Sequence, residues 1–142
     1  MTRGGPAKTV DGEVWRGRRH QARAFLKAAH TLEAVWEEGE NGNPIVVMIV
    51  LAAIAYGDAI TAKFAGAVNQ KDHSGLVRAV QTALGPRGGG DDAKRQLSRL
   101  AEILGEKDVA SYGARSGRIA HARKLLEQLT RFVTWADRLL EG

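Results

Sequence analysis

The feature that most constrains this sequence is a long apolar segment across residues 43–68. Every residue from position 45 to position 56 is apolar, and the alternation of a half-buried strand is absent. A helix that is apolar on all sides has to be surrounded by lipid or by other helices. Gly57 and Asp58 interrupt the run well short of the ~20 apolar residues that span a bilayer. We therefore predict a central helix packed inside a soluble bundle, without a membrane partner.

Four further helices are expected around this central one. Apolar residues recur at three- and four-residue steps over residues 13–38, 73–84, 91–112 and 117–140, and turn residues separate these segments. No segment has the pattern of a credible strand, and no internal repeat is present. The sequence therefore predicts an all-α, mainly up-and-down bundle of about five helices. This helical domain covers residues 13–142 and follows a flexible tail of residues 1–12.

The last predicted helix carries the widest apolar stripe. Its members are Ile119, Ala122, Leu125, Leu126, Leu129, Phe132, Val133, Ala136, Leu139 and Leu140. A stripe of this width indicates burial on two sides. Two arrangements satisfy it: a groove between two neighbouring helices, or one core contact plus a contact with a second copy of the chain.

The formal net charge is +5, which favours polyanionic partners such as RNA, DNA or an acidic protein, although a basic soluble surface alone also explains it. The densest basic cluster lies beside Trp15 and consists of Arg16, Arg18, Arg19, His20 and Arg23. It is either a phosphate-contacting patch or a solvated helix face whose long side chains cover the bundle. The chain has no cysteine, which excludes disulfides, cysteine-ligated zinc and a cysteine nucleophile, and which fits a reducing cytoplasm.

The histidines offer few catalytic arrangements. No two stand at metal-ligand spacing, so we expect neither a metal nor a cofactor. His121 follows Arg115 and Arg118, and an Arg–His pair serves a metal-independent ribonuclease, in which His moves a proton and Arg stabilises the charged transition state. His121 also adjoins the apolar stripe, so a structural role at its edge is the alternative. His73, in the first turn of the third predicted helix, either contacts a substrate or caps that helix.

Two charged residues, Asp58 and Lys63, lie in the second half of the central helix. A lone buried carboxylate is costly, so Asp58 needs a partner. Lys63, Lys107, Tyr112 or an arginine of the last helix are the candidates. Together they form either a polar pocket between helices or a buried network that fixes the helix register.

Four segments, taken in order, carry a family resemblance. They are AFLKAAH (24–30), AAIAYGDAITAKFAG (52–66), KDHSGLVRAV (71–80) and LAEILGEKDVASYGARSG (100–117). From about position 15 to position 140 the chain resembles the HEPN domain family, and in particular HEPN-like proteins of the actinobacterial type.

The resemblance implies a four- or five-helix bundle that commonly forms dimers. Many HEPN proteins are RNases, often toxins paired with a nucleotidyltransferase antitoxin, and active members carry an Arg and then a His near the end of the penultimate helix. Here that place holds Lys107 and Tyr112. Lysine lacks the bidentate fork of arginine, and tyrosine, with a reference pKa near 10, is a poor base at neutral pH. The resemblance thus implies Lys107 and Tyr112 as catalytic candidates with weak or absent RNase activity.

From the sequence we therefore expect a cytoplasmic, homodimeric HEPN-like domain of a toxin–antitoxin or defence system, with a nucleotidyltransferase-type partner. It would bind RNA or a nucleotide in a basic cleft lined by Asp58, Lys107 and Tyr112. The alternative is a non-catalytic protein-interaction or dimerisation module. Such a module would bind through the wide face of the last helix and the acidic residues within positions 37–40.

Overall fold

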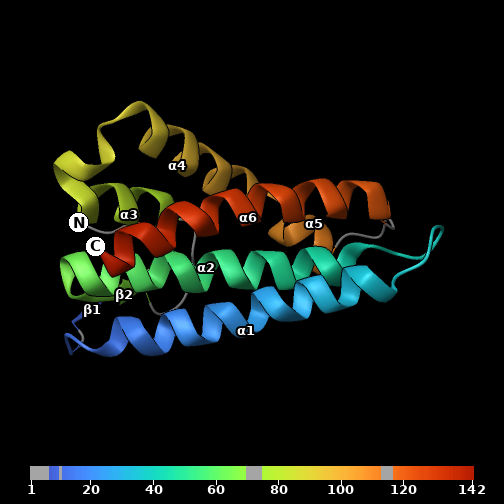
Figure 1. The fold of residues 1–142 in the computed structure, drawn as a ribbon, viewed down its shortest axis with the longest axis horizontal. Coiled ribbons are helices and arrows are strands. Elements are labelled where there is room, and N and C mark those ends of the chain that lie inside the picture. The colour runs from blue at the N-terminus through green and yellow to red at the C-terminus, as the bar shows by residue number, and fades with distance from the viewer. Residues whose placement is uncertain (1–6, 10, 70–74, 113–116) are drawn as a thin grey trace.

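The computed structural model describes residues 7–9, 11–69, 75–112 and 117–142, and it is an all-α bundle, as predicted (Figure 1). The long helices are α1 (Val14–Val35), α2 (Asn43–Ala65) and α6 (Ile119–Glu141). Shorter helices are α3 (Leu76–Leu84), α4 (Asp91–Leu104) and α5 (Lys107–Tyr112), with a 3₁₀ turn, η1, at Gly85–Gly88. Two short strands, β1 (Ala7–Thr9) and β2 (Ala67–Asn69), complete the described elements.

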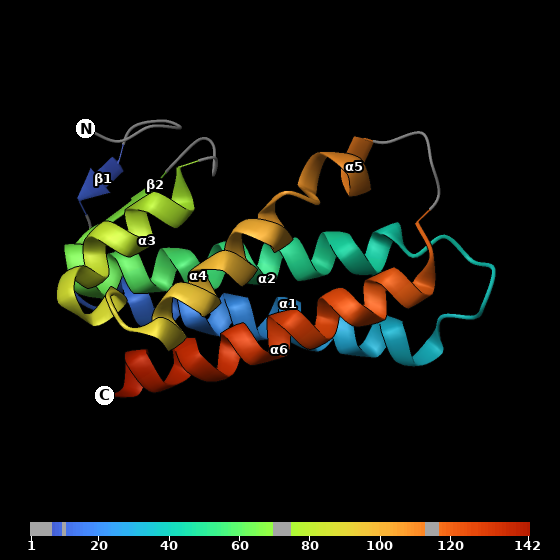
Figure 2. The ribbon, with the colours of Figure 1, turned by 90° about the horizontal axis from the view of Figure 1, so that it is seen from above.

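The centre of the bundle is α2, which contacts α1, α3, α4, α5 and α6. In Figure 1, α1 runs antiparallel to α2 and α6 runs parallel to it, and in Figure 2 α4 and α5 follow one another along α2. Every residue of α2 from position 52 to position 62 is buried. This helix is long and apolar enough to cross a membrane, but 83% of its most apolar window is buried inside the molecule. Such burial is what the core helix of a soluble protein shows.

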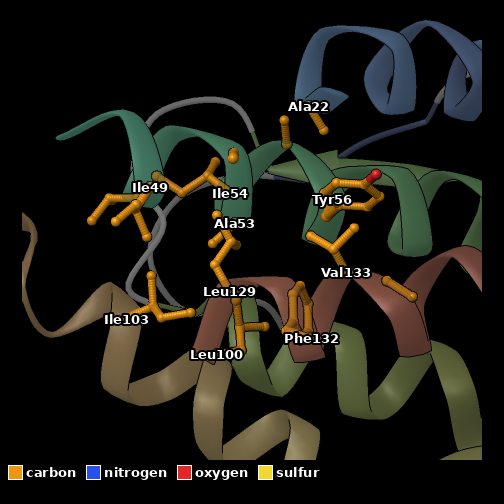
Figure 3. Close-up of a cluster of buried hydrophobic side chains, with 14 of the residues drawn as sticks. Ala22, Ile49, Ala53, Ile54, Tyr56, Leu100, Ile103, Leu129, Phe132 and Val133 are labelled. Carbon is orange, nitrogen blue, oxygen red and sulfur yellow. The ribbon is translucent and has the colours of Figure 1, made fainter. Parts of the chain in front are cut away.

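The wide apolar stripe of α6 is explained within a single chain. Of its ten predicted members, nine are buried and Leu139 is half-buried. They are covered because α6 packs against both α2 and α4. Figure 3 shows Leu129 and Phe132 of α6 meeting Ala53 of α2 and Leu100 of α4 in one cluster. The groove arrangement is therefore present, and the width of this stripe gives no support to a dimer contact.

Two features of the fold differ from the prediction. The helix expected over residues 91–112 is divided, since α4 ends at Leu104, Gly105 caps it, and α5 begins at Lys107. Glycine is a poor helix former, which explains why the break falls there. The structure also contains a strand pair that was not predicted: β1 and β2 are antiparallel, with Lys8 opposite Val68. Strands of three residues are too short to show an alternating pattern in the sequence.

The close approach of α2 and α3 generates a stability prediction. A Cβ atom added at Gly57 would lie 2.7 Å from Cδ2 and 3.0 Å from Cγ of the fully buried Leu76. Overpacking of this kind costs about 1–3 kcal/mol, which exceeds the ~1 kcal/mol that alanine gains over glycine inside a helix. Gly57→Ala should therefore lower the free energy of unfolding, measured by urea denaturation.

The matched control for this prediction is Gly17→Ala, because a Cβ atom added there in α1 would meet nothing within 4 Å. Without the steric penalty, this variant should be more stable than the wild type by roughly 0.5–1 kcal/mol. A Gly57→Ala protein that gained as much stability as Gly17→Ala would show that α3 does not pack this closely on α2.

Candidate functional site

Two of the predicted site residues, His121 and Lys107, lie at the place where α6 begins and α4 gives way to α5. His121 Nε2 is 2.8 Å from Glu106 Oε1, and the two side chains are 50% and 29% exposed. Lys107, the next residue after Glu106, is half-buried, and the exposed Arg118 is the N-cap of α6. The structure therefore pairs His121 with a carboxylate, which orients the imidazole. Sequence reasoning missed Glu106 because fifteen residues separate it from His121 and only the packing of α6 brings them together.

Three other predicted site residues have side chains that the structure does not describe. Tyr112 ends α5, and its side chain lies outside what the structure describes. Arg115 and His73 also lie outside the described residues. Within the described part of the chain, Lys107 makes no hydrogen bond or ion pair. The proposed catalytic pair, Lys107 and Tyr112, thus stays a prediction.

Asp58 is buried in α2, with only 4% of its surface exposed. Its Oδ1 has no hydrogen-bond partner in the described structure. Burial raises the pKa of this carboxyl to about 6, and the positive charge of Arg18 on α1 opposes that rise. Among the residues whose side chains the structure describes, the charge that acts on Asp58 is that of Arg18 on α1, and not that of a lysine or a last-helix arginine as the sequence suggested; the side chain of Tyr112, the other candidate, lies outside this description.

Lys63 has a structural role in the last turn of α2. Its ammonium group donates a hydrogen bond to the carbonyl oxygen of Leu140 at the end of α6. The same nitrogen lies 4.6 Å from the centroid of the Trp15 ring on α1. A cation at a helix C-terminus is favourable because it compensates the unpaired carbonyls there. Lys63 therefore joins α1, α2 and α6 and is occupied by these contacts.

A second polar cluster, absent from the sequence predictions, connects the same three helices. Tyr56 Oη lies 3.4 Å from Asp137 Oδ2, and Arg23 Nη2 lies 3.5 Å from Asp137 Oδ1. Burial raises the pKa of Tyr56 to about 12, so the phenol stays protonated and donates to the carboxylate. The position of Tyr56 at the end of the apolar run was the only signal of this cluster in the sequence.

Most of the basic residues lie on α1 and α6. Helix α1 holds five Arg or Lys residues and one Glu, and α6 holds four Arg or Lys residues and three acidic ones. Four ion pairs among the described residues connect the two helices: Arg19 to Glu141 at 3.2 Å, Arg23 to Asp137 at 3.5 Å, Arg23 to Glu141 at 3.6 Å, and Arg123 to Glu33 at 3.0 Å.

Other cations on these two helices remain available. Among the described residues, Lys27, Lys124 and Arg138 are exposed and make no ion pair. Arg131 is also exposed and pairs only with Glu127 of its own helix, at 3.0 Å. We call the surface that carries Lys27, Lys124, Arg131 and Arg138 the α1–α6 face. The first-helix arginines that the sequence singled out have different partners. Arg19 and Arg23 form ion pairs with α6, while Arg16 pairs with Glu13.

The side chains that the structure describes include no group of three or more His, Cys, Asp or Glu residues able to hold a metal ion.

No known protein-family model matches the sequence, and no curated protein is significantly similar to it.

The buried carboxyl of Asp58 makes unfolding depend on pH. Because its pKa is raised from 3.8 to about 6 in the folded state, the folded chain binds more protons than the unfolded chain between these values. Stability should therefore fall as pH rises from about 4 to about 6. Asp58→Asn removes this loss, so we expect it to be more stable than the wild type at neutral pH, by about 1–3 kcal/mol.

Thermal unfolding measured from acid to neutral pH tests this prediction, and the stability gap between Asp58→Asn and wild type should close in acid. Glu102→Gln, which neutralises an exposed carboxylate on α4, is the control and should leave the profile unchanged. An Asp58→Asn protein less stable than wild type at neutral pH would show that Arg18 more than offsets the burial of the charge.

Proposed function

We propose that this protein is a HEPN-like helical bundle that binds RNA or a nucleotide through its basic surface. The observation that carries the proposal is the surplus of positive charge on α1 and α6, with Lys27, Lys124 and Arg138 exposed and unpaired among the described residues. Exposed cations of this kind bind phosphates and release the counterions condensed on a nucleic acid. The all-α bundle and the net charge of +5 also support it.

The proposal also covers catalysis: any RNase activity lies at the junction of α4 and α5 and is weak or absent. Lys107 and Tyr112 are its candidate catalytic residues by resemblance, and the Glu106–His121 pair supplies a nearby imidazole oriented by a carboxylate. From the same resemblance we propose a cytoplasmic toxin–antitoxin or defence component with a nucleotidyltransferase-type partner.

A second candidate function, a protein-interaction or dimerisation module, is favoured by a different surface. Val35 of α1 is 67% exposed, and it is the exposed large hydrophobic residue of the described chain. It lies on the same side of α1 as the half-buried Phe25 and Leu32, and Val47 and Leu51 are half-buried on α2. An apolar surface of this kind fits a second copy of the chain or another protein.

The dependence of binding on salt separates these two functions. We expect a labelled RNA oligonucleotide to bind at low salt and to lose affinity steeply as salt rises, by about 0.7–0.9 logarithmic units per phosphate contact for each tenfold increase. Fluorescence anisotropy measures this slope. Self-association through the apolar surface should change little over the same range, and it is followed by light scattering. A protein with no RNA affinity at low salt would overturn the proposed RNA binding.

The catalytic part of the proposal is tested by incubating total RNA with the protein, without added metal. We expect slow cleavage by the wild type and none by a Lys107→Ala/Tyr112→Phe variant, because the variant loses both the cation and the phenol. Lys94→Ala, which removes an exposed cation from α4, is the control and should cleave like the wild type. Intact RNA with all three proteins would leave a binding function without catalysis, and cleavage by the double variant would reject these two residues.

A further inference from the structure

The ion pairs between α1 and α6 show the register of the two helices, that is, which residues of α1 stand beside which residues of α6. Arg19 meets Glu141, Arg23 meets Asp137, and Glu33 meets Arg123, so the helices are antiparallel, as Figure 1 also shows. In this register Lys27 stands at the level of Arg131. The exposed His20 stands at the level of Arg138 by the same reasoning.

The side chains of the α1–α6 face therefore form an α6 row of three cations and an α1 row that holds one cation, Lys27. On α6, Lys124, Arg131 and Arg138 follow one another at seven-residue steps, which places them on one side of the helix at intervals of about 10.5 Å. On α1 the cation of the face is Lys27, and the exposed His20 lies seven residues before it on the same side of the helix. Each row lies on a helix that packs against α2, so the rows are held at a fixed separation by the core.

The acidic groups between the rows are already neutralised. Asp137, Glu141 and Glu33 are each engaged by an arginine of the opposite helix. Glu127, the acidic residue next to the α6 row, pairs with Arg131. A polyanion approaching this face therefore meets the unpaired charges of Lys27, Lys124 and Arg138 without facing an unpaired carboxylate among the described residues of α1 and α6.

This face also lacks a platform for unpaired bases. The aromatic residues Trp15 of α1 and Phe132 and Trp135 of α6 are all buried, and Phe25 lies on the side of α1 that carries Leu32 and Val35. Proteins that hold single strands stack successive bases on exposed aromatic rings, whereas duplex RNA is recognised mainly by its shape and by contacts to its phosphates and 2′-hydroxyls. Three cations in a row on α6 and Lys27 opposite them on α1, without exposed rings, fit the backbone of a duplex.

We propose that the α1–α6 face binds the backbone of double-stranded RNA, with the α1 row and the α6 row contacting phosphates of opposite strands. The inference rests on the proposed RNA binding and adds to it the surface and the form of the ligand. It makes the binding surface distinct from the junction of α4 and α5, where Lys107 and His121 lie.

Binding is measured by fluorescence anisotropy with three labelled probes: an RNA duplex of about 20 base pairs, an oligouridine single strand of equal length, and a DNA duplex of the same sequence. We expect the wild type to bind the RNA duplex at least about tenfold more tightly than oligouridine. A Lys27→Ala/Lys124→Ala/Arg138→Ala variant should bind the RNA duplex roughly 100-fold more weakly or worse near 0.1 M salt, and its salt slope should fall by about two to three.

The control variant carries Arg78→Ala, Arg87→Ala and Lys94→Ala, which removes the same charge from exposed positions on α3, η1 and α4. It should change the salt slope by less than about one. Circular dichroism and urea denaturation of both triple variants establish that they are folded, which is expected because all six side chains are exposed.

The outcomes separate this inference from the proposed function. Oligouridine bound as tightly as the duplex, or equal losses in the two triple variants, would overturn the duplex surface and leave RNA binding in place. Equal affinity for the DNA duplex would support a duplex-backbone surface and overturn RNA as its ligand. No binding to any of the probes would overturn both proposals.

Discussion

The burial of α2 is the constraint on which the rest of this structure depends. A helix without a polar side is stable in water only when its neighbours cover it completely. The partners differ in what they contribute: α1 offers a narrow row at Trp15, Ala22 and Ala29, whereas α6 offers a stripe wide enough to contact α2 and α4 at once. Because apolar residues are drawn inward in this way, the outer sides of α1 and α6 are left to charged residues.

Tyr56 and Asp58, two of the polar side chains in the buried part of α2, show opposite solutions to burial. Tyr56 has partners, since Asp137 and Arg23 reach it from the neighbouring helices, and its high pKa keeps it neutral. Asp58 is acted on by the positive charge of Arg18, but its Oδ1 has no hydrogen-bond partner in the described structure. An unsatisfied buried polar group reduces stability, by about 1–3 kcal/mol in typical cases. Tyr56 therefore has a structural role, whereas the burial of Asp58 lowers the stability of the fold in a way that packing alone does not explain.

The sequence predicted the parts of this molecule that depend on local periodicity. The central helix, the apolar stripe of α6 and the all-α class follow from residue spacing, and the structure confirms them. Contacts between distant residues were not predictable, because they depend on how helices are set against one another. The β1–β2 pair, the Glu106–His121 pair and the Tyr56–Arg23–Asp137 cluster all belong to this class. The HEPN resemblance remains an expectation, because short motifs fix neither the register of the helices nor the chemistry of a site.

The ion pairs between α1 and α6 link the fold to the proposed surface. Exposed pairs of this kind contribute only about 0–1 kcal/mol each to stability, so their main effect is to set the register of two helices that the core already holds. They also neutralise Asp137, Glu141 and Glu33, so that the remaining cations act together. The apolar side of α1 around Val35 faces away from these pairs. A polyanion on the α1–α6 face and a protein on the apolar side would therefore occupy different surfaces, and binding of one would leave the other accessible.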